Sequence, residues 1–327
     1  AKKGRSKMAA KSRNLKIGII GLGMVGEPIR RWFEEKMGYQ RGLDLQCYDV
    51  NPKRGYYDDV NKSDIVFVAG PTPPNPDGSC NISIVDSMLA TLKGNKIVVI
   101  KSTVPPGTTE MLQKKYDNLR LIFNPEFLTE SQAWEDFINP SRQLIGYTDK
   151  SREDTLLVLS LLPRGRFRSP HYLDYWKFEL NATEAEVVKY ASNVFGACKV
   201  IFGNMFADYC LLLEQAYGLK VSYDNVKQSV GADPRIDLAW LDVYHGSYRG
   251  FGGYCFPKDL RAHIEALKKG LNLVEPSGLK TLIQKGINVL EAVWDYNITL
   301  LTLQNLTIED VSKHDKEIIL HKKKEIK

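Results

Sequence analysis

The sequence contains few cysteines, and nothing in their arrangement indicates a disulfide framework or a metal site. Its five cysteines are widely spaced without a Cys-x-x-Cys pair, and its five histidines show no His-Glu-x-x-His pattern. An odd number of scattered cysteines favours reduced thiols inside the cell. The missing ligand spacings give no reason to expect zinc. We therefore expect a cytoplasmic protein without a metal.

Long apolar runs are also missing. No stretch approaches the roughly 18 apolar residues of a membrane span, and the first residues are basic and small. Residues 1–16 hold seven basic residues and no acid, which leaves 38 basic against 39 acidic residues in the remainder. A basic leader of this kind is weak support for nucleic-acid binding. We expect a disordered leader over 1–16, and neither a nucleic-acid nor a membrane partner.

The 327 residues are enough for two domains. In the first half, short apolar runs alternate with polar loops that carry proline or glycine. They predict a doubly wound parallel sheet, which binds ligands at the carboxyl ends of its strands. From about residue 181 the pattern becomes helical. We predict an α/β fold with a Rossmann-like domain over 17–180, an all-helical domain over 181–300 and an extension over 301–327.

A Gly-x-Gly-x-x-Gly pattern formed by Gly21, Gly23 and Gly26 lies between the first apolar run and a helical stretch. In dinucleotide-binding folds the first glycine allows a tight turn, the second admits the pyrophosphate and the third allows close helix packing. Asp49 ends the second predicted strand, 23 residues after Gly26. It is placed to bind a ribose 2′-OH, which favours NAD over NADP. The alternative for Asp49 is a turn residue before the next proline.

Three glycines within Gly250–Gly253 precede Cys255, and Pro257-Lys258-Asp259 follows. Glycine lets a backbone pass close to a ligand. A cysteine at the end of such a loop, with Lys258 three residues later, has surroundings that favour a thiolate. The alternative is a buried, inert cysteine beside a turn.

A long helix is predicted to begin near Thr183, because Thr183 and Glu186 have the spacing of a capping box. On that helix Glu186, Lys189 and Asn193 lie at i, i+3 and i+7 and share one face. The alternative reading is a solvated helix face.

Several stretches of the sequence together resemble the nucleotide-sugar 6-dehydrogenases, the UDP-glucose/GDP-mannose dehydrogenase family. The matching pieces occur in the family's order over roughly residues 17–300. They are Gly21–Gly26, Pro71-Thr72-Pro73, Lys101-Ser102-Thr103-Val104-Pro105, Asn124-Pro125-Glu126-Phe127-Leu128, Ala185-Glu186-x-x-Lys189-Tyr190-x-x-Asn193, Asp233-Pro234-Arg235 and Gly252-Gly253-x-Cys255-x-Pro257-Lys258-Asp259. The resemblance implies NAD-dependent oxidation of a nucleotide sugar's C6 alcohol to the carboxylate. It further implies two hydride transfers through a thiohemiacetal and a thioester on Cys255.

The resemblance also assigns site residues. Cys255 would be the nucleophile, Lys189 and Asn193 would stabilise an oxyanion, Asp259 and Thr103 would hold a water, and Glu126 would activate the hydrolytic water. The implied cofactor contacts are Gly21, Gly23, Met24, Val25, Gly26, Asp49, Arg54, Pro71, Thr72, Pro73, Ser102, Thr103, Glu130 and Lys258. The implied substrate contacts are Glu126, Phe127, Leu128, Glu130, Lys189, Asn193, Arg235, Phe251 and Gly252.

The sequence departs from the family in identifiable ways. Glu27 follows the glycine pattern where the family has an apolar residue, and the expected form is a short one that lacks the family's C-terminal UDP-binding domain. These departures leave two alternatives open: a catalytically weak NAD- or nucleotide-binding protein, and a two-electron 3-hydroxyacid dehydrogenase. Apolar residues on the helix predicted over 276–300 need cover, so we also expect a homodimer.

Overall fold

The structure is a computed structural model that describes residues 15–173 and 176–312. The predicted basic leader therefore lies almost wholly outside the described residues, and the extension is described only as far as Ser312. The chain divides into two compact units. The first comprises residues 1–73 and 80–189, and the second comprises residues 74–79 and 190–327. Helix α7 (Ala182–Tyr217) contributes to both, because the division falls between Lys189 and Tyr190.

A seven-stranded sheet forms the centre of the first unit, in the order β11-β7-β5-β4-β3-β1-β2. Its strands are β1 (Ile17–Ile20), β2 (Leu45–Tyr48), β3 (Ile65–Val68), β4 (Ile97–Ile100), β5 (Arg120–Phe123), β7 (Gly146–Tyr147) and β11 (Leu180–Asn181). β1 to β5 pair in parallel, whereas β7 is antiparallel to β5. The predicted doubly wound sheet is confirmed, with a mixed edge. Since β1 lies between β2 and β3, the winding direction reverses there, and the carboxyl ends of β1 and β3 are where such sheets bind ligands.

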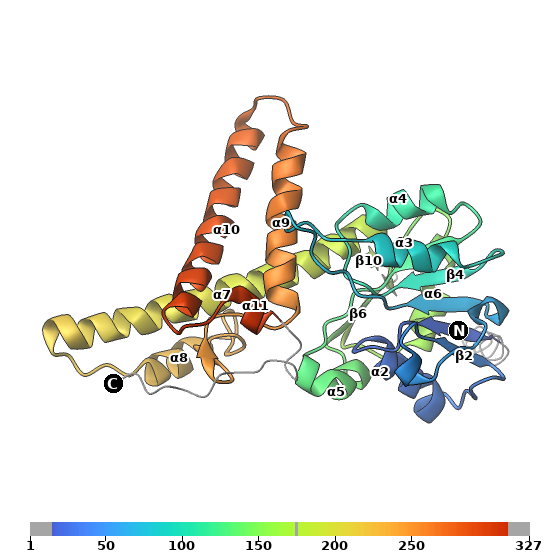
Figure 1. The fold of residues 1–327 in the computed structure, drawn as a ribbon, viewed down its shortest axis with the longest axis horizontal. Coiled ribbons are helices and arrows are strands. Elements are labelled where there is room, and N and C mark those ends of the chain that lie inside the picture. The colour runs from blue at the N-terminus through green and yellow to red at the C-terminus, as the bar shows by residue number, and fades with distance from the viewer. Residues whose placement is uncertain (1–14, 174–175, 313–327) are drawn as a thin grey trace. The chain divides into compact units, whose positions relative to one another are not determined.

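Alternate strand residues face two separate layers of helices. Ile17 and Ile19 of β1 pack with α2 (Gly26–Arg31), η1 (Trp32–Lys36), α5 (Ala133–Ile138) and α6 (Thr155–Leu161). Val66 and Val68 of β3 instead pack with α3 (Ser83–Ala90), α4 (Thr108–Lys115) and the start of α7. Figure 1 shows α3 and α4 on one side of the sheet and α2 and α5 on the other. Burial on both faces explains why the strands are continuously apolar.

Shorter elements complete the first unit. They are η2 (Pro52–Arg54), η3 (Val60–Lys62), η4 (Glu130–Gln132), η5 (Arg152–Asp154), β6 (Arg142–Leu144), β8 (Phe167–Ser169), β9 (His171–Leu173) and β10 (Trp176–Phe178). β6 pairs with β8, and β9 pairs with β10.

The predicted capping box at the start of α7 is wrong. The helix begins at Ala182, one residue before Thr183. Asn181 and Glu184 exchange the capping bonds instead: the Glu184 backbone N–H donates to Asn181 Oδ1 (2.9 Å), and the Asn181 N–H donates to Glu184 Oε2 (2.8 Å). Glu186 is buried and accepts hydrogen bonds at the start of α4. Its partner lies far away in sequence, so local spacing could not identify it.

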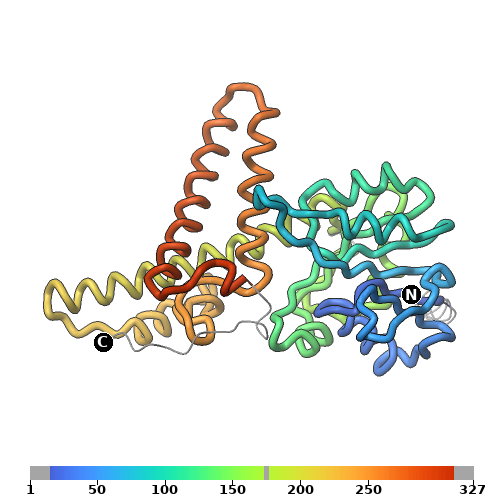
Figure 2. Tube along the Cα trace, in the orientation of Figure 1, coloured from blue at the N-terminus to red at the C-terminus, as the bar shows by residue number. Residues whose placement is uncertain are grey.

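The second unit is mainly helical. Besides α7 it contains α8 (Tyr223–Gly231), α9 (Cys255–Leu271), α10 (Gly278–Thr302), α11 (Ile308–Val311) and a small hairpin of β12 (Tyr244–His245) and β13 (Tyr248–Arg249). Its core joins Val200 and Ile201 of α7 with Leu260 and Ile264 of α9 and Ile287 of α10. The Cα trace in Figure 2 shows α9 and α10 as an antiparallel pair beside α7.

Within the described residues, α7 is the one helix whose length and mean hydropathy would allow it to cross a membrane. Half of its most apolar window is buried in the protein itself. A core helix of a water-soluble protein passes the same test, so this finding is a weak indication of a membrane span.

Candidate functional site

The three glycines of the dinucleotide pattern have three different steric environments, all in the first unit. Gly21 has φ +88°, a conformation that favours glycine. A Cβ atom on Gly26 would lie 1.8 Å from the carbonyl oxygen of Gly21, so the start of α2 packs directly on the turn. A Cβ on Gly23 would meet nothing within 4 Å, so this position faces open space. A tight turn, an open approach and a close packing contact are what a pyrophosphate loop requires.

Asp49 and Arg54 are both attached to this glycine loop. The Leu22 N–H donates to Asp49 Oδ2 (2.6 Å), and the Asn51 N–H donates to Oδ1 (2.8 Å). Arg54 Nε lies 3.6 Å from Asp49 Oδ2, and its guanidinium donates to the carbonyl of Leu22. A carboxylate oxygen accepts more than one hydrogen bond. Asp49 therefore keeps the capacity to bind a ribose hydroxyl while it orients the loop.

Glu27 does not place an uncompensated charge beside the glycine loop. Arg30 Nε donates to Glu27 Oε2 (2.9 Å), and a second guanidinium nitrogen pairs with Oε1 (2.5 Å). This bidentate pair within α2 holds the Glu27 carboxylate on Arg30, whose guanidinium also pairs with Glu34 of η1. The acid that departs from the family's pattern is thus compatible with an anionic ligand.

Hydrogen bonds join the loops that follow β3 and β4. The Thr72 hydroxyl donates to the carbonyl of Thr103 (2.8 Å), and the Ser102 hydroxyl donates to the carbonyl of Gly70 (2.7 Å). Thr72 and Ser102 are buried, whereas Thr103 is half-buried. These bonds position two predicted cofactor-binding segments at the carboxyl edge of the sheet.

A buried ion pair that the sequence did not reveal lies at the same edge. Lys101 Nζ is 2.6 Å from Glu126 Oε2, in a contact whose angles are not those of a hydrogen bond. The same Lys101 nitrogen donates a hydrogen bond to Asn124 Oδ1 (2.6 Å). Burial lowers the pKa of Lys101, and the neighbouring Glu126 carboxylate opposes this effect. Lys189 Nζ donates to the Glu126 carbonyl (2.5 Å) and lies 5.3 Å from the centre of the Phe127 ring. Lys101 therefore holds the predicted water-activating carboxylate in place.

The sequence offered one signal for Lys101: a lysine directly follows a continuous buried strand. Its partner is 25 residues later, so the pair itself could only be found in three dimensions. Leu128 and Glu130 lie further along the same segment and are half-buried, with Glu130 opening η4.

In the second unit, Cys255 is the first residue of the 17-residue helix α9 and is half-buried. Four residues later Asp259 is fully buried. Asn193 Nδ2 donates to Asp259 Oδ2 (2.5 Å), and Lys258 Nζ pairs with Oδ1. The predicted residues Asn193, Lys258 and Asp259 thus form one buried, charge-compensated group. The solvated-face alternative fails for Lys189 and Asn193, since both are buried.

Three predicted substrate residues of the second unit have different environments. The Arg235 side chain is 87% exposed and pairs with Asp233. Phe251 is buried against Trp294, with ring centres 6.3 Å apart, and both of its backbone polar groups are bonded to Asn297. Gly252 is half-buried and tightly packed. Arg235 is therefore available to an anionic ligand, whereas the Phe251 side chain belongs to the core.

The structure brings the predicted residues together in two sets. The first unit contains the glycine loop, Asp49, the Thr72 and Thr103 loops, Glu126 and Lys189. The second unit contains Cys255, Asn193, Lys258, Asp259 and the loop before Cys255. Among the described residues, no group of three or more His, Cys, Asp or Glu side chains is placed to hold a metal ion.

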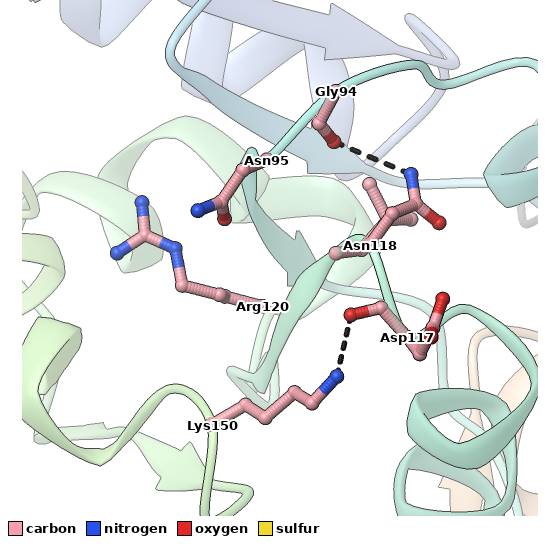
Figure 3. Close-up of a pocket in the computed structure, with 7 residues that line it drawn as sticks. Gly94, Asn95, Asp117, Asn118, Arg120 and Lys150 are labelled. Atoms are coloured by element: carbon pink, nitrogen blue, oxygen red, sulfur yellow. Dashed lines mark hydrogen bonds between the residues drawn. The ribbon is translucent and has the colours of Figure 1, made fainter.

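A separate hollow of about 410 Å³ lies at the amino-terminal ends of β4 and β5, where Figure 3 shows Asn95, Arg120 and Lys150 around it. The Lys150 ammonium group bonds to the carbonyl of Asp117, and Asn118 bonds to the carbonyl of Gly94 (3.3 Å). Arg120 pairs with Asp154 (2.7 Å). The polar groups of Lys150, Asn118 and Arg120 thus mainly join neighbouring segments of the chain. None of the predicted site residues lines this hollow.

Comparisons with known proteins point to one family. The sequence model of the UDP-glucose/GDP-mannose dehydrogenase family's NAD binding domain matches residues 53–159, and that of the family's central domain matches residues 183–280. UDP-glucose 6-dehydrogenase of Rickettsia bellii is 31% identical over 259 residues, which cover 75% of this chain and 54% of that protein. UDP-glucose 6-dehydrogenase AglM of Haloferax volcanii is 34% identical over 230 residues, covering 65% of this chain and 50% of that protein.

Solved structures show the same likeness. A UDP-glucose dehydrogenase from the archaeon Pyrobaculum islandicum superposes with a TM-score of 0.64 at 29% identity, over 89% of this chain and 71% of that one. The chain spans about half the length of the curated relatives named above. The glycine cradle fits NAD, and the matched ranges include β3 to β5, most of α7 and the cysteine loop. On this basis the chain belongs to the UDP-glucose/GDP-mannose dehydrogenase family and contains its NAD binding and central domains.

Proposed function

We propose that this chain carries out the NAD-dependent oxidation of a nucleotide sugar's C6 alcohol to the carboxylate. The observation that carries the proposal is the position of Cys255 at the first residue of α9, one turn before the buried group of Asp259, Asn193 and Lys258. A cysteine at a helix amino terminus is favoured as a thiolate, since the helix dipole stabilises negative charge there. A simple alcohol dehydrogenase has no need of such a nucleophile.

Cys255 would act at the aldehyde stage. The thiolate adds to the aldehyde carbon and forms a C–S bond, which gives a thiohemiacetal. Loss of a hydride and a proton from this adduct leaves a thioester, and water then cleaves the C–S bond to release the acid and the thiolate. When bound, NAD accepts the hydride of each oxidation. The covalent bond keeps the reactive aldehyde from escaping between the two steps.

The other residues have roles that their surroundings support. Lys189 and Asn193 would stabilise the oxyanions, and Asn193 retains one amide N–H beyond the one bonded to Asp259. By the same resemblance, Asp259 and Thr103 would hold the water that relays the first proton. Glu126 would activate the hydrolytic water, with its carboxylate held beside the Lys101 ammonium group.

The remaining assignments concern binding. The cofactor would be held by the glycine loop, Asp49 and the loops after β3 and β4. The exposed Arg235 would bind substrate phosphate, and the half-buried Phe127, Leu128 and Glu130 would line the sugar. The cytoplasmic location stays a prediction.

The test is the amount of NADH formed per molecule of acid with a panel of nucleotide sugars. We expect two NADH per acid from the wild type and no acid from Cys255→Ala. Cys198→Ala, which alters another half-buried cysteine, is the control and should behave as wild type.

Each alternative has its own result in this experiment. Binding of NAD without sugar-dependent NADH would indicate a binding protein. One NADH per product, unaffected by Cys255→Ala, would indicate a two-electron dehydrogenase. Either result would refute the thioester mechanism.

We also propose that the chain forms a homodimer in which the exposed apolar face of α7 takes part. Part of the apolar face of α10 is covered in its own chain, where Ile287 is buried and Ile283, Leu290, Val293 and Trp294 pack around it, whereas Leu279, Leu282 and Val289 are exposed. On α7, a longer set of large apolar residues at helical spacing is exposed: Phe202, Met205, Phe206, Tyr209 and Leu212. A contiguous apolar stripe of this kind is typical of an interface.

The dimer is tested by the mass from light scattering at micromolar concentration. We expect twice the chain mass for the wild type and the chain mass for Phe202→Glu/Phe206→Glu. A monomeric wild type would refute the proposal, as would a variant that remains dimeric.

A further inference from the structure

A buried amide side chain in α10 holds the loop that leads to Cys255. Asn297 is fully buried. The Phe251 N–H donates to Asn297 Oδ1 (2.8 Å), and Asn297 Nδ2 donates to the Phe251 carbonyl (3.0 Å). An amide is costly to bury unless it is hydrogen-bonded. Here the amide bonds both backbone groups of one residue, as a neighbouring strand would.

Two further contacts bind the same loop at alternate residues. The Arg249 N–H donates to Gln304 Oε1 (2.7 Å), and Gln304 Nε2 donates to the Arg249 carbonyl (3.1 Å). The Gly253 N–H donates to the carbonyl of Val311 in α11 (2.8 Å). Arg249, Phe251 and Gly253 are thus each fixed by α10, by Gln304 just after it, or by α11.

The glycines of this loop are required by the same contacts. Gly250 has φ +102°, and a Cβ there would lie 2.5 Å from Asn297 Oδ1. A Cβ on Gly252 would lie 2.9 Å from Val311 Cβ. The glycine-rich composition before Cys255 therefore serves close approach to α10 and α11, in addition to any approach to a ligand.

We propose that Asn297 is a positioning residue for Cys255, with Gln304 in a supporting role. The inference rests on the proposed function of Cys255 as the nucleophile. Cys255 opens α9 two residues after Gly253, so the path of the loop decides where the first turn of α9 begins. A thiolate is stabilised by the helix amino terminus only in the correct orientation, which the amide contacts of Asn297 and Gln304 maintain.

The test is the rate of Cys255 alkylation by iodoacetamide between pH 6 and pH 9, followed by mass spectrometry of the Cys255 peptide. Asn297→Leu has a similar volume and lacks both hydrogen bonds. We expect its alkylation to be roughly tenfold slower near neutral pH, in proportion to the loss of two modest hydrogen bonds. Asn288→Leu, an exposed position on the same helix, is the matched control and should react as wild type.

A folded Asn297→Leu variant that is alkylated at the wild-type rate at every pH would overturn the proposal. If that variant fails to fold, Gln304→Leu decides, because within the loop it releases Arg249 and leaves the Asn297 bonds to Phe251 in place, at the cost of one further bond to the Leu300 carbonyl. A slower rate supports the proposal and a wild-type rate refutes it. Alkylation requires neither NAD nor a sugar. The result therefore stands apart from the NADH measurement, and failure of either experiment leaves the other interpretable.

Discussion

Glu186 makes the stability of the first unit depend on pH in a direction that can be measured. Its carboxylate is fully buried and accepts hydrogen bonds from Gly107 N (2.6 Å), Thr109 N (2.8 Å) and Thr109 Oγ1 (2.6 Å). Burial raises the pKa of Glu186 from 4.5 to about 7 even against these three bonds. The group ties the start of α4 to α7, one turn before Lys189.

The sign follows from proton binding. The folded protein holds the Glu186 proton to a higher pH than the unfolded chain does. The contribution of this group to the free energy of unfolding is therefore complete below pH 4.5 and is lost as the pH rises to about 7. At about 1.4 kcal/mol per pH unit, that interval amounts to about 3 kcal/mol.

Glu186→Gln removes this titration. We expect the difference in unfolding free energy between the variant and the wild type to change by about 3 kcal/mol from pH 4.5 to pH 8, in favour of glutamine at the higher pH. Urea unfolding at a series of pH values measures it. Glu135→Gln, at an exposed carboxyl, is the control and should show a constant difference. A constant difference for Glu186→Gln as well would mean that the three hydrogen bonds fully offset burial, and would refute the reasoning.

Substitutions at Lys101, at two glycines of the dinucleotide loop and at Gly196 test the packing and charge of the two units. Lys101→Met leaves the Glu126 carboxylate half-buried without its cation and should lower the free energy of unfolding by about 3–5 kcal/mol. The double variant Lys101→Met/Glu126→Leu should recover most of this loss in urea unfolding. A double variant without any recovery would contradict the stabilising role of the ion pair. Gly26→Ala, whose Cβ would lie 1.8 Å from a backbone oxygen, should prevent correct folding, whereas Gly23→Ala should fold normally and weaken NAD binding in calorimetric titrations. Gly196→Ala places a methyl group 2.5 Å from a phenylalanine ring carbon of α9 and should cost about 1–3 kcal/mol in thermal or urea unfolding; an unchanged midpoint would show that the ring moves freely.

The glycine loop shows how much local structure a short sequence motif can predict. The order of glycines between a strand and a helix predicts a turn, an open approach and a close contact, and Gly21, Gly23 and Gly26 have these environments. Such predictions succeed because each depends on neighbours within a few residues. The same holds for the buried strands, whose continuous apolar character reports burial on two faces.

The sequence by itself determined the doubly wound sheet, the dinucleotide loop and a cysteine at the end of a glycine loop. Only the tertiary structure decided the electrostatic partners. Lys101 meets Glu126, Glu186 caps a helix 77 residues earlier, and Asn297 binds Phe251 across 46 residues. Each of these pairs joins two segments that are far apart in the sequence, and the local pattern of one segment does not predict the other. Side-chain spacing along a helix or strand reports which face is buried, whereas the identity of a buried charge's partner depends on how distant elements pack.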